Sequence, residues 1–163
     1  MDKSYFRENL KNCKSYGEIF DLVKKAVKKT LGLHRVGLLL YLSNLPPNIG
    51  AYHILGSNII VLNKLLIYAV SKSMFSKIEF NSLVFSLLLH EYLHSLGFLN
   101  EREVRRLVYK VSLDVFGEDH PAVRMAVEPP LLNPSIMSLK KYLPNDELEI
   151  IRNFEKTESS YIA

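Results

Sequence analysis

The chain has 163 residues, of which 48% are hydrophobic and 23% are charged, and its formal net charge at pH 7 is +4. This length and composition are sufficient to bury a core without disulfides, so we expect a single domain over residues 1–163. The single cysteine, Cys13, excludes an internal disulfide framework and a site built from several thiolates. It favours a reduced, cytoplasmic setting.

Charge and hydropathy patterns exclude two classes of partner. Basic pairs such as Lys24 with Lys25 and Arg105 with Arg106 are spread over separate predicted elements, as on solvated helix faces. We therefore expect no nucleic-acid partner. The apolar runs are far shorter than the roughly 20 residues that cross a bilayer. The charged N-terminal residues also lack the apolar core of a secretory signal, so we expect no membrane partner.

The first half of the chain predicts three helices and a buried strand. Residues 4–14 and 17–31 have the hydrophobic period of helices that bury one face. The apolar run 35–42 predicts a buried strand, because it is short and is followed by turn-forming residues. Residues 64–72 predict a short helix.

Between the strand and the third helix, the sequence predicts a β-hairpin. Residues 51–55 and 58–63 are strand-like, and the two residues between them, with Gly56 first, are typical of a tight hairpin turn. We expect this hairpin to form an edge of the sheet. An exposed edge strand can bind an extended peptide through main-chain hydrogen bonds.

Residues 90–94, His-Glu-Tyr-Leu-His, place two imidazoles one helical turn apart with a carboxylate between them. Because residues four apart share one face of a helix, His90 and His94 can bind the same metal ion. Glu91 points to the side, where it can hold a metal-bound water. The almost wholly apolar run that begins at Asn81 predicts a buried, capped helix that continues through the motif.

The residues around the motif favour a metal site over a pair of ordinary core histidines. Ser82 and Ser86 continue the spacing of His90 and His94, which makes one polar stripe on an apolar helix, and the small Ser86 leaves room for an ion. Two buried imidazoles without an ion would each need another hydrogen-bond partner. Gly97 then suits the left-handed turn that ends such a helix.

The third metal ligand is expected at the start of the next helix. Zinc in a hydrolytic site takes three protein ligands and leaves a fourth position open. The metzincin pattern would put the third ligand at Asn100, which is a poor zinc ligand. Asn100 instead predicts the N-cap of a helix from Glu101 to about Phe116. Either Glu101 or Glu103 can be the ligand, although Glu103 can also close a capping box and Glu101 can favour the positive end of the helix dipole.

The motif, eight further residues and Glu103 resemble the minigluzincins, small archaeal members of the gluzincin metallopeptidases. The resemblance covers about residues 34–116, which it makes the core of the domain. It implies a zinc site formed by His90, His94 and Glu103, with Glu101 as the alternative third ligand, and it implies that Glu91 is catalytic.

One departure from larger gluzincins concerns the residue that orients a ligand histidine. Those proteins often have an aspartate four residues after the ligand glutamate. Here that position is Leu107 after Glu103, or Arg105 after Glu101. Asp114 and Asp119 are the remaining candidates for a residue that fixes the tautomer of a histidine.

After Phe116 the sequence becomes rich in proline, and residues 117–163 predict a loop, short helices and a polar tail. We expect helices over 135–142 and 145–155. This segment is long enough to lie across the cleft, which predicts a latent enzyme. The other histidines lack metal-ligand spacing and are expected to be structural or at the surface: His34, His53 and His120.

Together these patterns predict an α+β fold. A small, mostly antiparallel sheet is expected to pack on the motif helix and on the following glutamate-bearing helix, with extra N- and C-terminal helices. The predicted function is a zinc-dependent metallopeptidase that acts on peptide or protein substrates, with Glu91 as general base. A non-catalytic, zinc-stabilised interaction protein is the alternative. An RNA-cleaving zinc hydrolase is disfavoured by the dispersed charge and by Asn100.

Overall fold

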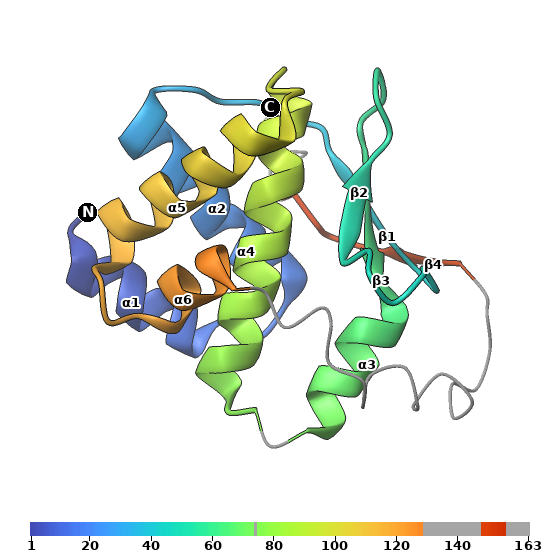
Figure 1. Cartoon of the computed structure of the whole chain (residues 1–163), viewed down its shortest axis with the longest axis horizontal. Coiled ribbons are helices and arrows are strands. Elements are labelled where there is room, and N and C mark those ends of the chain that lie inside the picture. Colours follow the sequence, from blue (N-terminus) through green and yellow to red (C-terminus); the bar gives the residue numbers. More distant parts are fainter. Residues whose placement is uncertain (74, 129–147, 156–163) are drawn as a thin grey trace.

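The computed structural model describes residues 1–73, 75–128 and 148–155, and Figure 1 shows how their helices and strands are arranged. The elements are, in chain order, α1 (Lys3–Asn12), α2 (Tyr16–Leu31), β1 (Leu39–Ser43), β2 (Ala51–His53), β3 (Ile59–Asn63), α3 (Lys64–Lys72), α4 (Lys77–Ser95), α5 (Glu101–Phe116), α6 (Pro121–Val127) and β4 (Glu149–Ile151). The predicted α+β class is confirmed.

The four strands form one mixed sheet in the order β2-β3-β1-β4. β1 and β3 are parallel, whereas β2 pairs with β3 and β4 pairs with β1 in the antiparallel sense. Two of these three pairings are antiparallel, as expected. The predicted hairpin is present, and its first strand, β2, is at one edge of the sheet.

The hairpin turn differs from the predicted one. The backbone N–H of Ser57 donates to the carbonyl of Ile54 at 3.0 Å, so the central residues of the turn are Leu55 and Gly56. Gly56 has φ +79°, which a type II turn requires at its third position and which glycine adopts without strain. The strands are accordingly shorter than predicted, because residues 54–58 belong to the turn region.

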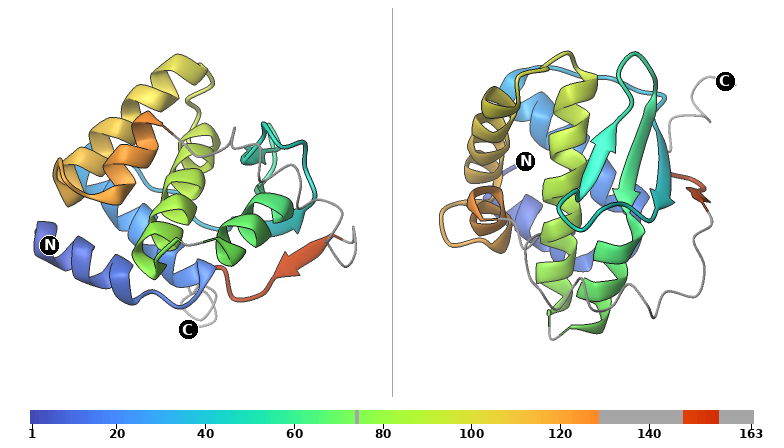
Figure 2. Two further views of the ribbon diagram at one scale, coloured as in Figure 1. Left: turned by 60° about the horizontal axis from the view of Figure 1, so that its bottom comes forward. Right: turned by 45° about the vertical axis from the view of Figure 1, so that its right-hand side comes forward.

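Helix α4 lies between the sheet and a group of helices formed by α1, α2, α5 and α6 (Figures 1 and 2). This position explains its composition, because a helix covered on opposite sides has to be apolar on both. It begins at Lys77, four residues before the predicted start, since Ser76 and Glu79 form a capping box. Asn81 is inside the helix and donates instead to the carbonyls of Leu10 and Cys13.

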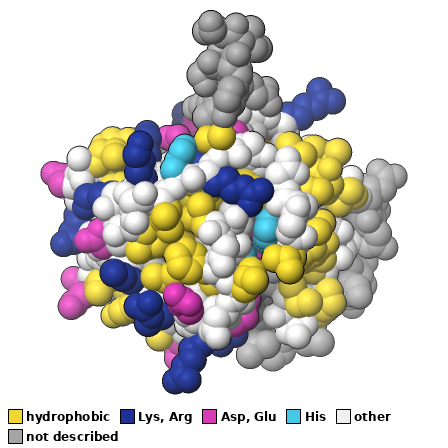
Figure 3. Space-filling view, turned by 90° about the horizontal axis from the view of Figure 1, so that it is seen from above, with side chains coloured by type: hydrophobic (Ala, Val, Ile, Leu, Met, Phe, Trp, Pro, Cys, Tyr) yellow, Lys and Arg dark blue, Asp and Glu magenta, His cyan; other side chains and the backbone are white. Residues whose placement is uncertain are grey.

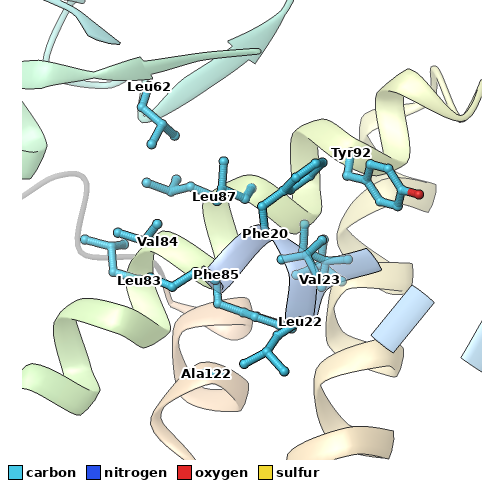
Figure 4. Packing of buried hydrophobic residues seen from close by; sticks show 14 of the residues in the cluster. Phe20, Leu22, Val23, Leu62, Leu83, Val84, Phe85, Leu87, Tyr92 and Ala122 are labelled. Carbon is cyan, nitrogen blue, oxygen red and sulfur yellow. The ribbon is translucent and has the colours of Figure 1, made fainter. Parts of the chain in front are cut away.

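The hydrophobic core is centred on α4 and is shown from close by in Figure 4. Phe20 of α2 packs edge-on against Tyr92 of α4 and is stacked on Phe154, with ring centroids 5.4 Å and 4.2 Å away respectively. Phe6 and Leu10 of α1 are fully buried in the same cluster. The core therefore extends beyond residues 34–116 on both sides.

Two elements after Phe116 differ from the prediction. Residues 121–127 form α6, although no helix was expected there, and the helix expected over 135–142 lies outside the described residues. Where a helix was expected over 145–155, residues 149–151 form strand β4 and pair with β1. The carboxylate of Glu155 also accepts hydrogen bonds from the backbone N–H groups of Gly37 and Leu38. These long-range contacts determine the local conformation.

His120, which was expected to be structural or at the surface, is the N-cap of α6 and is buried. Its Nδ1 accepts the backbone N–H of Ala122 at 3.1 Å, and its ring is stacked on Phe116. Burial, together with the positive charges of Arg7 and Arg124, lowers the pKa of His120 to about 4.

Protonation of His120 should destabilise the fold, because its pKa is lower in the folded chain than the value of about 6.5 in an unfolded chain. The stabilising contribution is complete above about pH 6.5 and is lost as the pH falls toward about 4. Between pH 7 and pH 5, we expect the free energy of unfolding in urea to fall by about 1–2 kcal/mol more in the unaltered chain than in His120→Asn. Asparagine keeps the capping acceptor.

The matched control is His34→Asn, at an exposed histidine. This variant should show the pH dependence of the unaltered chain. An equal loss of stability between pH 7 and pH 5 in His120→Asn and in the unaltered chain would contradict the destabilising effect assigned to protonation of His120.

Candidate metal centre

The connection between α4 and α5 brings the two helices back against each other. Gly97 has φ +106°. Its N–H donates to the carbonyl of His94, and the N–H of Phe98 donates to the carbonyl of Leu93. These two bonds are the pattern of a Schellman motif. Three residues after Gly97, the side chain of Asn100 caps α5 by accepting the N–H of Glu103 at 3.0 Å. The predicted left-handed turn and the predicted N-cap are both confirmed.

This connection places the first residue of α5 beside both motif histidines. His90 Nε2 lies 3.0 Å from Glu101 Oε2, and His94 Nε2 lies 2.6 Å from Glu101 Oε1. One ligand atom from each of the three residues lies within 4.8 Å of the others, so the group can hold a metal ion. Ligands about 2 Å from a tetrahedral zinc ion are about 3.3 Å apart, so small side-chain movements are sufficient to admit an ion.

The hydrogen bonding of His94 leaves its Nε2 directed at Glu101. His94 Nδ1 lies 2.7 Å from the carbonyl oxygen of Phe98, which can only accept, so Nδ1 carries the hydrogen. In the neutral ring Nε2 then has a lone pair, yet it faces a carboxylate oxygen of Glu101. Two acceptors at this distance repel unless a proton or a metal ion lies between them.

Electrostatics in the group are those of a partly buried cation site. Burial lowers the pKa of the His90 imidazole, although the charge of Glu101 opposes this effect, and a neutral imidazole is the form that binds a metal. Partial burial raises the pKa of Glu101, but the two histidines lower it overall. Glu101 is therefore ionised, and His90 and His94 can act as ligands beside it.

Glu91, the predicted general base, is buried and lines the same cavity as the three candidate ligands. Burial raises its pKa to about 8, and the negative charge of Glu101 adds to the rise. A hydrogen bond from the backbone N–H of His53, on edge strand β2, opposes the rise. The carboxylate is thus held between the motif helix and the edge of the sheet.

The preference for Glu103 as third ligand is corrected by this geometry. Residues two apart on a helix point about 200° apart, so only one of Glu101 and Glu103 can face the histidines. Glu101 does so, and Glu103 lies with Arg102 and Arg106 at a separate surface depression. Of the capping box weighed for Glu103, the structure shows the half that Asn100 contributes, in which its side chain accepts the backbone N–H of Glu103.

The candidates for orienting a histidine are also corrected. The Phe98 carbonyl fixes the tautomer of His94, as described above. Asp114 instead accepts a hydrogen bond from Thr30 at 2.7 Å, and the backbone carbonyl of Asp119 accepts one from Arg124. A backbone carbonyl at the end of a turn cannot be identified by residue type, which is why the sequence did not indicate it.

The site opens into a cavity of about 670 Å³ between α4, α5, α6 and the β2–β3 hairpin. Figure 3 shows the end of the molecule at which α4 ends and α5 begins, with hydrophobic patches between polar and charged side chains. Ser86 lines the cavity one helical turn before His90, and Met125 and Val127 contribute an apolar wall from α6. This wall was not predicted, although Pro121 after a capping residue is a recognised helix-start signal.

The remaining predicted residues have structural roles or lie apart from the site. His34 is exposed, whereas His53 lines the cavity and its Nε2 lies 3.0 Å from the carbonyl of Ser57. The hydroxyl of Tyr92 is hydrogen-bonded to the backbone of Arg35, so it points away from the ligands. The predicted covering of the cleft falls mostly on residues 129–147 and 156–163, which lie outside the described residues. Strand β4 is at the sheet edge opposite β2.

Comparisons with known proteins add no family to this description. No model of a protein family matches the chain, and neither a curated protein nor a solved structure matches it. None of the helices in the described residues has the length and apolar character needed to cross a bilayer.

Proposed function

We propose that this chain is a zinc-dependent metallopeptidase, in which His90, His94 and Glu101 hold the metal and Glu91 is the general base. The observation that carries the proposal is the convergence of two imidazole nitrogens and one carboxylate on a single point, beside a buried glutamate in an open cavity. The expected resemblance to gluzincins is retained only in part. Glu101 follows His94 after six residues (95–100), whereas the minigluzincin-like spacing to Glu103 has eight.

The donor set supports zinc in a catalytic rather than a structural role. Two histidine nitrogens and one carboxylate oxygen are typical of hydrolytic zinc sites, whereas structural sites usually have four protein ligands and often cysteine. Within the described residues the group has three members, and the side chain of Glu101 is 55% exposed, so the site is open to solvent. When bound in such a site, zinc polarises a carbonyl and lowers the pKa of water.

The residues of the chain itself supply proton transfer and substrate alignment. Glu91 accepts the proton of the attacking water and delivers it to the leaving amine. Its burial beside the cavity keeps it close to the reacting atoms and away from bulk water. We place the activity in the cytoplasm, on the basis of the single cysteine.

The edge strand supports a peptide as the substrate. The N–H of Asn63 donates to the carbonyl of Gly50, and the N–H of Ile54 donates to the carbonyl of Ile59. Because backbone groups alternate in direction along a strand, those of Gly50, Tyr52 and Ile54 face β3. The backbone groups of Ala51 and His53 therefore point away from the sheet. Both residues line the cavity. An extended peptide can pair with Ala51 in the manner of an added strand.

The proposal predicts hydrolysis of unstructured peptides that depends on zinc. We expect the zinc-loaded chain to cleave a mixture of peptides of diverse sequence, with new termini detected by mass spectrometry. A chelator should abolish cleavage, and added zinc should restore it. Zinc should also raise the midpoint of thermal unfolding, because it binds the folded state. If zinc raises this midpoint while every peptide stays intact, the alternative of a zinc-stabilised interaction protein replaces the peptidase.

A further inference from the structure

The cavity contains one basic side chain whose role the proposed chemistry leaves open. Arg105 follows Glu101 by one helical turn, so both residues project from the same face of α5. Arg105 lines the cavity with the candidate ligands, and its positive charge contributes to the lowered pKa of His90. Arg105 is the only Lys or Arg among the residues that line this cavity in the described part of the chain.

The two acidic side chains that line the cavity with Arg105 have other partners. Both carboxylate oxygens of Glu101 are directed at the histidines, and Glu91 accepts the N–H of His53. Within the part of the chain that the structure describes, the Arg105 side chain forms no hydrogen bond and no ion pair. Its planar group of five N–H donors is thus available to a carboxylate that enters the cavity.

The charges in the loaded site favour an anionic group on the substrate. A divalent ion and Arg105 contribute three positive charges, and the carboxyl groups of Glu91 and Glu101 contribute at most two negative ones. Part of the cavity wall is apolar and is formed by Val108, Met125 and Val127. A carboxylate that enters the cavity beside Arg105 is therefore attracted by the positive charges of the loaded site.

We propose that Arg105 is a specificity-determining residue that binds a carboxylate of the substrate, with the neighbouring apolar wall taking an adjacent hydrophobic side chain. This inference rests on the proposed peptidase function. The carboxylate has two possible sources, which share the same chemistry: an acidic side chain, or the C-terminus of a short peptide.

The test measures peptide binding to the zinc-loaded Glu91→Gln variant, which should bind substrates without cleaving them. The probes are fluorescein-labelled peptides that share one sequence except at a single position, which is glutamate or glutamine. This position is varied along the peptide, and each peptide is made with a free and with an amidated C-terminus. We expect one of these carboxylates to increase affinity about tenfold, as a charge-assisted hydrogen bond does. Adding Arg105→Gln should remove this increase and leave zinc content and affinity for the neutral peptide unchanged.

Arg106→Gln is the matched control, because it removes the same charge from the same helix at the separate depression shared with Glu103. It should retain the preference for the carboxylate. Equal binding of all peptides, absence of binding, or an equal loss in both arginine variants would overturn the proposal. If the carboxylate peptide binds more tightly but the chain with Glu91 intact cleaves no peptide, the peptidase function alone is rejected. If peptides are cleaved but the carboxylate gives no increase in affinity, the role of Arg105 alone is rejected.

Discussion

Replacing Glu91 with glutamine should abolish peptidase activity and leave the bound zinc in place. Glutamine has nearly the same shape, and its carbonyl oxygen can still accept the N–H of His53 that the carboxylate accepts in the native chain. It cannot accept a proton from water. Loss of a general base typically lowers the rate about 100- to 10,000-fold. We expect a decrease of this size in kcat/KM for a cleaved peptide, with unchanged zinc content.

The control for this substitution is Glu103→Gln, which also neutralises one glutamate near the turn between α4 and α5. Glu103 is exposed and away from the histidines, so its replacement should leave kcat/KM within about twofold of the native value. Activity retained in Glu91→Gln would reject the role of Glu91. A loss of zinc in that variant would mean that Glu91 is a ligand or supports one.

The parts of the site that were predicted correctly depend on short stretches of sequence. The spacing of His90 and His94 fixes their common face as soon as the segment is helical. Gly97 and Asn100 act locally too, because the first supplies the left-handed turn and the second caps the next helix. These signals determine that α5 returns beside the motif, which is why the site is where the sequence placed it.

The third ligand could not be determined in this way. The choice between Glu101 and Glu103 depends on how α5 is rotated about its axis, and packing of the whole helix determines that rotation. Val104, Val111 and Val115 are fully buried and orient the helix against its neighbours. The hydrophobic pattern identifies this buried face but puts both glutamates near its edge. A rotation of α5 by about half a turn would exchange their positions.

The C-terminal elements were missed for a different reason. β4 has three residues, and its pairing partner in β1 is more than 100 positions away, with Ile151 opposite Leu40. A strand this short forms because a partner edge is present, so local propensity has little influence. The contact of Phe154 with Phe20 and the contacts of Glu155 with the residues before β1 have the same non-local origin.

Zinc affinity should distinguish Glu101 from Glu103. Glu101→Gln replaces a carboxylate that faces both imidazoles with a poor ligand, which leaves two histidines to hold the ion. Removing a residue that only orients a ligand typically costs about 10- to 100-fold in metal affinity, so loss of a ligand should cost at least about 100-fold. Competition with a chromophoric chelator at pH 7.5 measures this change, and circular dichroism confirms that the variant is folded.

Glu103→Gln removes the same charge two residues away, so it controls for any long-range effect of charge on a cation. It also keeps the capping hydrogen bond, since the donor to Asn100 is the backbone N–H. We expect its zinc affinity to stay within about threefold of the native value. The opposite result, with zinc lost in Glu103→Gln and kept in Glu101→Gln, would restore the ligand set implied by the minigluzincin-like spacing. It would also require α5 to rotate by about half a turn on binding the metal.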